Sequence, residues 1–485
     1  MTPKPTLILL ATATLAGCTA GPDYSGPPEI LTASGVKGFI RADDNVSDIA
    51  PELANWWVLL DDPALDRLIE DALADSPSLE AAYARIAQSR ASLAQEDAGR
   101  LPTLGTQATV VQGRLPGLDI QDGPQLPPGT PGATVEEDDD NVSLYNLGLN
   151  ANWEIDFGGG TGRRIEAANA QLAVAVANAE DARLQLTAEV ANAYVNLREA
   201  QQRAAQYQLQ IELQRQVLAL TYQRYQLGAL PLFPVGNANA ELELLNAQLA
   251  EAQADEAVLL DALAVLTGRV PGAPSLEIAP AGEIPLPPER VAVGDPASLI
   301  ARRPDIRAAE RNLAGATARI GIAEAAKFPK LSFMGILGLG GSSPEDIFDV
   351  GEFSAIAIPR LQWNFLDFGR IEASIDQAEG GRREADANYR QTVLAALQDA
   401  ERALSRFAQQ RAALAALAQI NRQAITAADL DQQRFDAGTI SRVDLNRTLR
   451  AEHEAGADLA RARAGLTLAW IALQKSLGLG WQAPS

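Results

Sequence analysis

The sequence predicts an α+β membrane protein with an internal two-fold repeat, in which transmembrane β-strands are continued by long α-helices. Two long stretches are rich in Ala, Gln, Leu, Glu and Arg and almost free of Pro and Gly, a composition that favours helix. Between the helical stretches lie segments of about ten residues in which apolar and polar side chains alternate, as in a strand with one apolar face. The same order of segments occurs twice along the chain.

The N-terminal residues have the pattern of a secretory signal followed by a lipidation site. A basic start at residues 1–4 precedes an apolar run at residues 6–15, which is too short to span a bilayer. Small residues then lead to Cys18 in a Leu-Ala-Gly-Cys sequence that matches the bacterial lipoprotein box. We therefore expect residues 1–17 to be removed and Cys18 to be lipidated, although an ordinary signal with a chance cysteine is the alternative. Thr19, rather than Asp, favours the outer membrane.

Charge and composition exclude several classes of function. The formal net charge is −22, so a nucleic-acid partner is not expected, because phosphate binding needs a basic surface. The chain has one Cys and one His, His453, which lies on a predicted helix without a nucleophile or ligand pattern nearby. We expect no metal, no cofactor and no catalytic site. Gly158–Gly162 follows a strand and precedes a helix, but no Gly-Lys-Ser/Thr follows, so we interpret it as a turn and not as a phosphate loop.

A weak internal repeat defines the predicted domains. Five stretches of the first half match the second half in order: 77–82 with 304–309, 100–104 with 327–331, 153–158 with 363–369, 224–228 with 434–438, and 266–268 with 476–478. The predicted organisation is a signal peptide at 1–17, a lipidated extended segment at 18–62, a first repeat at 63–268, a Pro-rich equatorial connector at 269–297, a second repeat at 298–478 and a C-terminal tail at 479–485.

Each repeat is expected to contain two barrel strands, about 101–112 and 142–157 in the first and about 329–340 and 353–367 in the second. The alternation is clearest where apolar residues share one face: Tyr145, Leu147, Leu149, Ala151 and Trp153, and, in the second half, Leu331, Phe333, Leu337 and Leu339. Strands of about ten residues cross a bilayer when tilted. One such strand alone would fit a soluble sandwich, but four of them between long helices favour the membrane.

The predicted helices include two very long ones. A first helix is expected at about 63–98 and its counterpart at about 304–326. The long helices follow at about 163–227 and 370–437, the second interrupted only at Gly380 and Gly381. About 65 residues at 1.5 Å each give a length of roughly 100 Å, so these helices must pack side by side with neighbours.

Four spanning strands cannot stand alone in lipid, because the two outer strands would leave unpaired backbone groups. Copies of the chain must therefore complete one barrel by cyclic symmetry. Two copies would give eight strands and three would give twelve, and physical reasoning alone does not choose between them.

Several motifs carry a resemblance that covers essentially the whole mature chain. They are Cys18 followed by 21–24, 55–57 with 62–69, and above all 298–306, which reads Ser-Leu-Ile-Ala-Arg-Arg-Pro-Asp-Ile. The chain resembles the TolC-like outer-membrane factor family, most closely its lipidated NodT/OprM branch. The resemblance implies a homotrimer with a twelve-strand barrel in outer-membrane lipid, a periplasmic helical barrel and an equatorial domain. It also implies a passive efflux duct, and not an enzyme, that works with a periplasmic adaptor and an inner-membrane pump, commonly of the resistance-nodulation-division type.

The resemblance also assigns the candidate site residues. Two helical hairpin tips are expected to contact the adaptor through Arg224, Tyr225, Leu227, Gly228 and Ala229, and through Arg434, Phe435, Gly438, Thr439, Ile440 and Ser441. Our hypothesis is that Asp444 and Arg447 pair between subunits and form the periplasmic gate; the alternative is that both face water. Two features depart from the family pattern. At the first tip, Pro231 and Pro234 bracket Leu232 and Phe233 where a polar turn is usual, and Asn446-Arg447 stands where relatives often carry another Asp.

Two other functions remain open on sequence grounds. The exit duct of a type I protein-secretion system uses the same architecture. A periplasmic coiled-coil scaffold that never spans the membrane would use the same helices. The aromatic residues near the strand ends favour a membrane-spanning sheet, because they suit an interfacial belt: Trp153, Phe157, Trp363, Phe365 and Phe368.

Overall fold

A computed structural model describes residues 20–28, 30, 38–42, 46–47, 49, 51, 54–114, 141–272 and 282–481. The predicted signal peptide and Cys18 lie outside these ranges. The chain divides into two compact units. Unit 1 comprises Met1–Pro27, Ala87–Ala173 and Glu310–Ala387, and unit 2 comprises Pro28–Ile86, Val174–Ala309 and Asn388–Ser485.

Helices make up most of the described chain. They are α2 (Pro63–Asp75), α3 (Pro77–Ala98), α4 (Gly160–Gln226), α5 (Phe233–Leu266), α6 (Pro296–Arg302), α7 (Pro304–Ala325), α8 (Arg370–Asp436) and α9 (Arg442–Ser476). The long helices α4 and α8 have 67 residues each, and α8 runs unbroken through Gly380 and Gly381. None of the helices in the described part of the chain combines the length and the apolar character that crossing a bilayer requires.

The helix predicted over about 63–98 is two helices, and that prediction was wrong on this point. Ser76 separates α2 from α3 and has an extended backbone, with φ −70° and ψ 122°. The cause is Pro77, because a proline ring disfavours the helical conformation of the residue before it. Arg303 separates α6 from α7 in the same way, with φ −66° and ψ 124° before Pro304.

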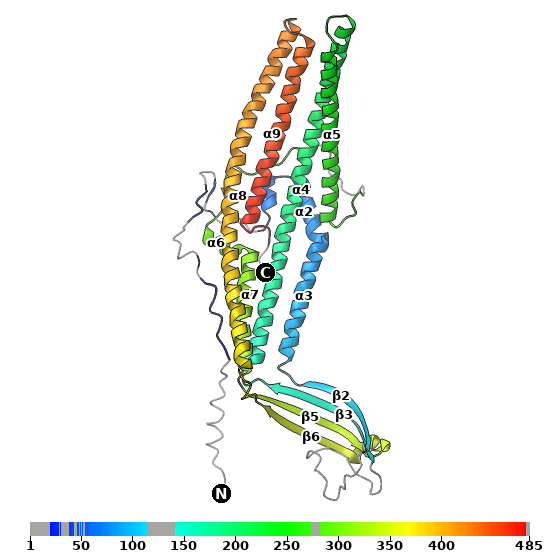
Figure 1. Cartoon of the computed structure of the whole chain (residues 1–485), viewed down its shortest axis with the longest axis vertical. Coiled ribbons are helices and arrows are strands. Elements are labelled where there is room, and N and C mark those ends of the chain that lie inside the picture. The colour runs from blue at the N-terminus through cyan, green and yellow to red at the C-terminus, as the bar shows by residue number, and fades with distance from the viewer. Residues whose placement is uncertain are drawn as a thin grey trace. The chain divides into compact units, whose positions relative to one another are not determined.

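The sheet of unit 1 has four antiparallel strands in the order β2-β3-β5-β6 (Figure 1). They are β2 (Thr103–Arg114), β3 (Asn141–Ile155), β5 (Lys330–Gly341) and β6 (Phe353–Gln362), with the short 3₁₀ helices η3 (Pro344–Phe348) and η4 (Val350–Glu352) between the last two. The central pair, β3 and β5, joins the two halves of the chain. Strand β6 ends at Gln362, earlier than the expected end near 367. Its partner residue, Lys330, directly follows Pro329, which has no N–H to extend the ladder.

The register places apolar side chains on one face of the sheet. Leu147 lies between Ala108 and Leu339, and Phe333 lies between Trp153 and Pro359. Residues directly opposite in antiparallel strands point to the same face, so these side chains form one surface. The opposite face is mixed: it carries Asn146, Asn150 and Asn152 of β3, and also Met334 and Ile336 of β5. The alternation predicted for β3 is therefore confirmed.

Unit 2 is built around a core of aromatic and aliphatic side chains. Trp56, in the 3₁₀ helix η1 (Trp56–Leu60), packs edge-on against Trp470 of α9, with ring centroids 5.4 Å apart. Leu65 and Ile69 of α2 are fully buried beside them. The short strands β1 (Val46–Ser47) and β4 (Val291–Ala292) pair in parallel within the same unit.

A buried polar chain anchors α2 to α4 inside this core. Asp62 caps α2 by accepting from the backbone N–H of Ala64, and its other carboxylate oxygen accepts from the Tyr194 hydroxyl at 2.7 Å. The Arg198 guanidinium donates to the same hydroxyl at 3.0 Å. Burial, followed by the hydrogen bond to Asp62, raises the pKa of Tyr194 to about 12. Tyr194 therefore stays protonated and holds the cap in place.

Candidate functional site

The first predicted tip is a tight turn between α4 and α5. Gly228 has φ +71°, its N–H donates to the Tyr225 carbonyl at 2.9 Å, and the Ala229 N–H donates to the Arg224 carbonyl at 2.9 Å. This pair of bonds is the Schellman motif, which satisfies the last carbonyls of a helix and places glycine at the left-handed position. The turn presents its predicted side chains, with Leu227 among them, to solvent.

The surface of this first tip is apolar. Leu227, Leu232 and Phe233 are 83%, 60% and 75% exposed. Pro234 is at the first turn of α5, where a missing N–H costs nothing. Large apolar side chains concentrated at a rigid turn suit contact with a partner protein. The prolines that depart from the family pattern thus frame an apolar surface and not a polar turn.

The second predicted tip repeats the geometry between α8 and α9. Gly438 has φ +72° and donates to the Phe435 carbonyl at 2.9 Å, while the Thr439 N–H donates to the Arg434 carbonyl at 2.8 Å. The guanidinium of Arg442 lies 4.0 Å from the centre of the Phe435 ring, a cation–π contact. Ile440 and Phe435 are half-buried, and the other predicted residues of this tip, Ser441 among them, are exposed.

The predicted gate residues lie together at the start of α9. Ser441 and Asp444 form a capping box: the Asp444 N–H donates to the Ser441 hydroxyl at 3.2 Å, and that hydroxyl donates to the Asp444 carboxylate at 2.6 Å. This hydrogen bond, with the charges of Arg447 and Arg224, lowers the pKa of Asp444. Arg447 Nη1 lies 3.8 Å from Asp444 Oδ1 in the same chain. Pairing between subunits stays a prediction. The sequence reasoning missed the cap, although a serine three residues before an acid is its signal.

A polar layer between α4 and α9 was also missed. Asn446 is buried, and its amide donates to Gln216 Oε1 at 3.1 Å. One turn further along α9, Arg450 donates to Gln214 Oε1 at 2.7 Å and pairs with Glu241 of α5. Polar residues four apart share a helix face, so the spacing was a signal. Their partners, more than two hundred residues away in the chain, could not be read from it.

His453 extends this layer. Its Nδ1 lies 3.1 Å from Gln206 Oε1, within hydrogen-bond distance. Over the ranges that the structure describes, no group of three His, Cys, Asp or Glu side chains is arranged to hold a metal ion. Its contact with Gln206 gives His453 a place in the packing of α9 against α4.

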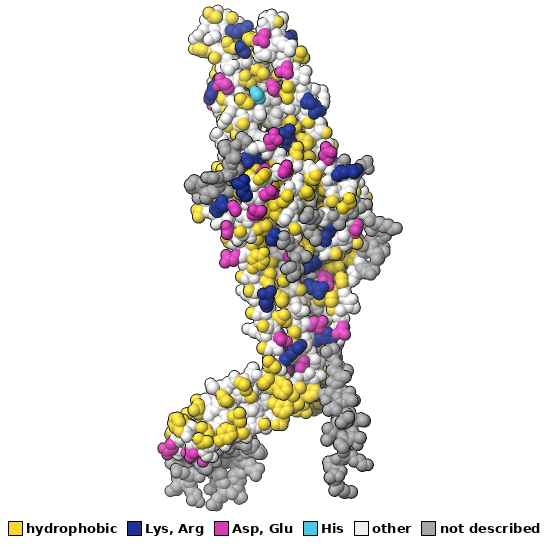
Figure 2. Space-filling model, turned by 180° about the vertical axis from the view of Figure 1, so that it is seen from behind, with side chains coloured by type: hydrophobic (Ala, Val, Ile, Leu, Met, Phe, Trp, Pro, Cys, Tyr) yellow, Lys and Arg dark blue, Asp and Glu magenta, His cyan; other side chains and the backbone are white. Residues whose placement is uncertain are grey.

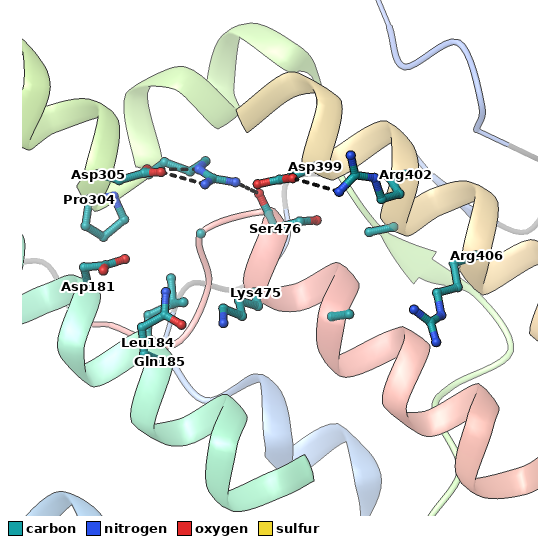
Figure 3. Close-up of a pocket in the computed structure, with 14 residues that line it drawn as sticks. Asp181, Leu184, Gln185, Pro304, Asp305, Asp399, Arg402, Arg406, Lys475 and Ser476 are labelled. Carbon is teal, nitrogen blue, oxygen red and sulfur yellow. Dashed lines mark hydrogen bonds and ion pairs between the residues drawn. The ribbon is translucent and has the colours of Figure 1, made fainter. Parts of the chain in front are cut away.

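Unit 2 contains a charged cavity of about 360 Å³ between α4, α7, α8 and α9 (Figure 3). The Arg303 guanidinium donates to both carboxylate oxygens of Asp305, at 3.0 and 2.6 Å, and to the Ser476 carbonyl at 2.8 Å. Burial, followed by the charge of Asp305, raises the pKa of Asp181 in the wall. Arg303 and Asp305 belong to the motif at 298–306, but the sequence did not indicate that Asp181 and Lys475 lie beside them.

Both faces of the sheet in unit 1 carry exposed side chains, and the apolar face is the more unusual. Leu149, Leu337 and Leu361 are about half exposed or more. Figure 2 shows hydrophobic side chains spread over this sheet. Strands β2 and β6 have no partner on their outer edges among the described residues. An apolar face and two open edges are the features that a single protomer leaves unsatisfied.

Comparisons with known proteins agree with this arrangement over nearly the whole chain. The profile of a family described as "Outer membrane efflux protein" matches residues 68–269 and 296–479. Nodulation protein T of Rhizobium leguminosarum bv. trifolii is 28% identical over 470 residues, covering 96% of this chain and 95% of that protein. The pyoverdine export outer membrane protein OpmQ of Pseudomonas aeruginosa is 31% identical over 442 residues, covering 90% and 89%. The solved structure of the outer-membrane channel OprN matches with a TM-score of 0.83 at 29% identity, covering 96% and 100%.

Proposed function

We propose that this chain, which belongs to the outer membrane efflux protein family, is the exit duct of a tripartite efflux system. The family consists of outer-membrane efflux channels, which are not enzymes, and the chain is located in the outer membrane with its helical part in the periplasm. In the proposed system an inner-membrane pump, of the resistance-nodulation-division type, passes small molecules through a periplasmic adaptor into the duct.

The observation that carries the proposal is the sheet of unit 1. One face is apolar along all four strands, and the outer edges of β2 and β6 are unpaired in the described structure. Lipid covers the apolar face at no cost but cannot satisfy the open edges. Three copies joined β6 to β2 would close a twelve-strand barrel, with the apolar face toward lipid and the Asn and Gly positions toward a water-filled lumen.

The two-fold repeat is part of the proposal and has support in the helix ends. Gly268 and Gly478, which the sequence aligned, have φ +70° and +74°. Each closes a Schellman turn, because the following residues, Arg269 and Leu479, donate back to Ala264 and Gln474 at 2.7 and 3.2 Å. The tips at Gly228 and Gly438 make a second matching pair of turns. Matching turns at matching positions in the two halves support the proposal that the chain contains an internal two-fold repeat.

The hairpin tips are the proposed adaptor contacts. The apolar first tip, with Leu227 and Phe233 exposed, and the mixed second tip, with Arg434 and Thr439 exposed, present different chemistry to a partner. Desolvated apolar and Arg side chains are the usual energetic centres of such interfaces. Asp444 and Arg447, just beyond the second tip, are the proposed gate.

Two substitutions on opposite faces of β3 test the proposal. Leu149→Arg places a charge on the apolar face, which costs about 2–4 kcal/mol in the middle of a bilayer. Asn152→Arg places the same charge on the other face. We expect purified wild-type protein and Asn152→Arg to form detergent-dependent trimers that conduct ions in planar bilayers, the second with increased anion preference. Leu149→Arg should not assemble. Equal behaviour of the two variants, or a water-soluble, non-conducting wild-type monomer, would overturn the channel assignment.

A further inference from the structure

The segment Ala20–Tyr24, which contains the Gly-Pro-Asp-Tyr motif, lies in a socket on unit 1 formed by Arg163, Gly321 and Glu310. Arg163, in the first turn of α4, is the centre of this socket, and only 5% of its side chain is exposed. Its guanidinium donates to the carbonyl oxygens of Ala20 and Gly21, at 2.9 and 3.0 Å, and to the Asp23 carboxylate at 2.7 Å. A buried arginine is thus largely committed to one short segment near the N-terminus.

Two glycines allow the segment to lie directly on α7. A Cβ added to Gly21, which has φ +84°, would be 2.5 Å from the Cα of Gly321. A Cβ added to Gly321 would be 2.6 Å from the Ala20 carbonyl oxygen and 2.7 Å from Cγ of Arg163. Real Cβ atoms do not approach backbone this closely, so any side chain at either position would push the segment out of the socket.

Two more hydrogen bonds fix the ends of the segment. The Ala20 N–H donates to the carbonyl of Gly158, in the connection between β3 and α4, at 3.2 Å. The Tyr24 hydroxyl donates to Glu310 of α7 at 3.0 Å. The segment is therefore tied to the place where the sheet passes into the helices of unit 1.

From this geometry we propose that the socket fixes the lipid anchor of the protein to the base of the sheet. The inference rests on the proposed function and on the predicted lipidation of Cys18. Cys18 precedes Ala20 by two residues, so its Cα is at most about 7 Å from that of Ala20. Acyl chains on Cys18 must then enter the membrane beside the sheet. Anchor and sheet become one membrane-binding unit, because a short fixed connection gives the second contact a high effective concentration.

The alternative is that the segment only stabilises unit 1, with no relation to the lipid. The two possibilities differ in one respect. If the socket positions the anchor, its loss matters only when an anchor is present. If the socket is only structural, its loss matters equally with and without lipid.

Arg163→Met and Arg164→Met form a matched pair for testing the socket itself. Arg164 is the next residue of α4, is 40% exposed, and bonds to Glu96 and Thr161, outside the socket. We expect hydrogen exchange of the peptide that contains Ala20–Tyr24 to become at least about tenfold faster in Arg163→Met, because bonds to a charged donor are stronger than neutral ones. Arg164→Met should exchange as the wild type does. Unchanged exchange in Arg163→Met would overturn the socket.

A double-mutant cycle with Cys18→Ser, carried behind an ordinary cleavable signal, tests the role of the lipid. The measurement is the rate at which newly made full-length chain forms heat-resistant oligomers in the outer membrane. In lipidated chain, Arg163→Met should slow this rate severalfold, with palmitate labelling unchanged. In the Cys18→Ser background it should have no further effect. An equal slowing in both backgrounds, or no slowing in the lipidated chain, would overturn the proposal. Failure of the wild type itself to form conducting oligomers would instead overturn the proposed function.

Gly321→Ala blocks the socket without removing a charge and guards against a folding defect peculiar to Arg163. Its control is Gly315→Ala on the same helix, where an added Cβ would be an ordinary 3.4 Å from Ala170 Cβ. Gly321→Ala should reproduce both effects of Arg163→Met, and Gly315→Ala neither. The opposite pattern would contradict the inference.

Discussion

Trp153 and Trp363 make the same hydrogen bond in the two halves of the chain. The indole N–H of Trp153 donates to the carbonyl of Arg100, and that of Trp363 donates to the carbonyl of Lys327, each at 3.0 Å. Arg100 and Lys327 begin the stretches that the sequence aligned, each followed by a proline two residues on. Each indole therefore fastens the end of a β-hairpin to the segment that leads from a helix into it.

Trp153→Phe keeps the ring and removes the donor. We expect the free energy of unfolding to fall by about 1 kcal/mol, the usual net contribution of one hydrogen bond. Trp363→Phe should lose a similar amount, and the double variant should show additive losses because the two bonds share no partner. Chemical denaturation in detergent measures all three. The control is Phe365→Leu, which alters an aromatic side chain that contacts the Trp363 ring but carries no hydrogen-bonding group. An equal loss there would contradict the explanation.

Glycine-to-alanine substitutions at the two tips should lower the free energy of unfolding, whereas one inside α5 should raise it. Gly228→Ala and Gly438→Ala force an alanine to φ near +70°, which costs about 1–2 kcal/mol. Gly236→Ala, inside α5 and with open space around its Cα, should stabilise the protein by about 0.5–1 kcal/mol because alanine is the better helix former. The midpoint of denaturant unfolding gives the sign in each case. A stabilised Gly228→Ala variant would show that the turn is not required.

The gate hypothesis is best tested without disturbing the cap of α9. Arg447→Gln removes the cation 3.8 Å from Asp444 and leaves the bonds between Ser441 and Asp444 intact. If the pair holds the tip shut between subunits, single-channel conductance or open probability should rise, and more so in Asp444→Ala/Arg447→Ala. Arg434→Gln, which loses an exposed pair with Asp431, is the control. Unchanged conductance in the double variant would remove the gate assignment.

The pair of Asp444 and Arg447 also allows a prediction of how conductance depends on pH. The pKa of Asp444 is lowered, chiefly by the hydroxyl of Ser441. A carboxyl with a depressed folded pKa contributes stability above its unfolded value of 3.8 and loses it as the pH falls through the folded value. Conductance should therefore be constant on moderate acidification and change only below the ordinary aspartate range. A transition near pH 6 would point to another group.

Asp181 and Glu180 are neighbours on α4, and burial raises the pKa of both carboxyls. Burial and Asp305 raise the pKa of Asp181, so its charged form is penalised in the folded state. That destabilisation is absent below the unfolded pKa and grows as the pH rises through the folded one. Asp181→Asn should raise the free energy of unfolding at pH 7 and not at pH 3. Glu180→Gln should change it with the same sign but by less, because the ion pair with Arg307 opposes the rise that burial causes in the pKa of Glu180. Urea titrations at the two pH values decide the matter.

The parts of the fold that follow from local pattern were predictable. The alternation of Leu331, Phe333, Leu337 and Leu339 indicated a strand with one apolar face, and β5 is that strand, because a period of two fixes which side chains share a face. Pro77 is a local signal for the break at Ser76, because a proline disfavours the helical conformation of the residue before it. Partners distant in sequence were not predictable. Nothing local indicates that β3 pairs with β5, or that Arg450 meets Gln214.

In the candidate site, too, local features were predictable from the sequence and contacts between distant residues were not. The turns at Gly228 and Gly438 follow from glycine after a long helix. The resemblance predicts a role between subunits for Asp444, yet its hydrogen-bond partner within the chain is Ser441, three residues away. The socket around Arg163 could not be predicted from the sequence. It joins residues about 140 positions apart, and no sequence pattern indicates that the Arg163 side chain is buried.

The contacts of Asn446, Arg450 and His453 have a consequence for how α9 can move along α4. An interface made only of alanine and leucine would allow α9 to slide along α4, because each apolar side chain would exchange one apolar neighbour for another. Here each side chain has a specific partner, so a slide of one turn, about 5.4 Å, would break all three contacts at the same moment. These polar contacts therefore fix the register of α9 against α4 more than they add to its stability. α9 can leave this register only by moving to another discrete position.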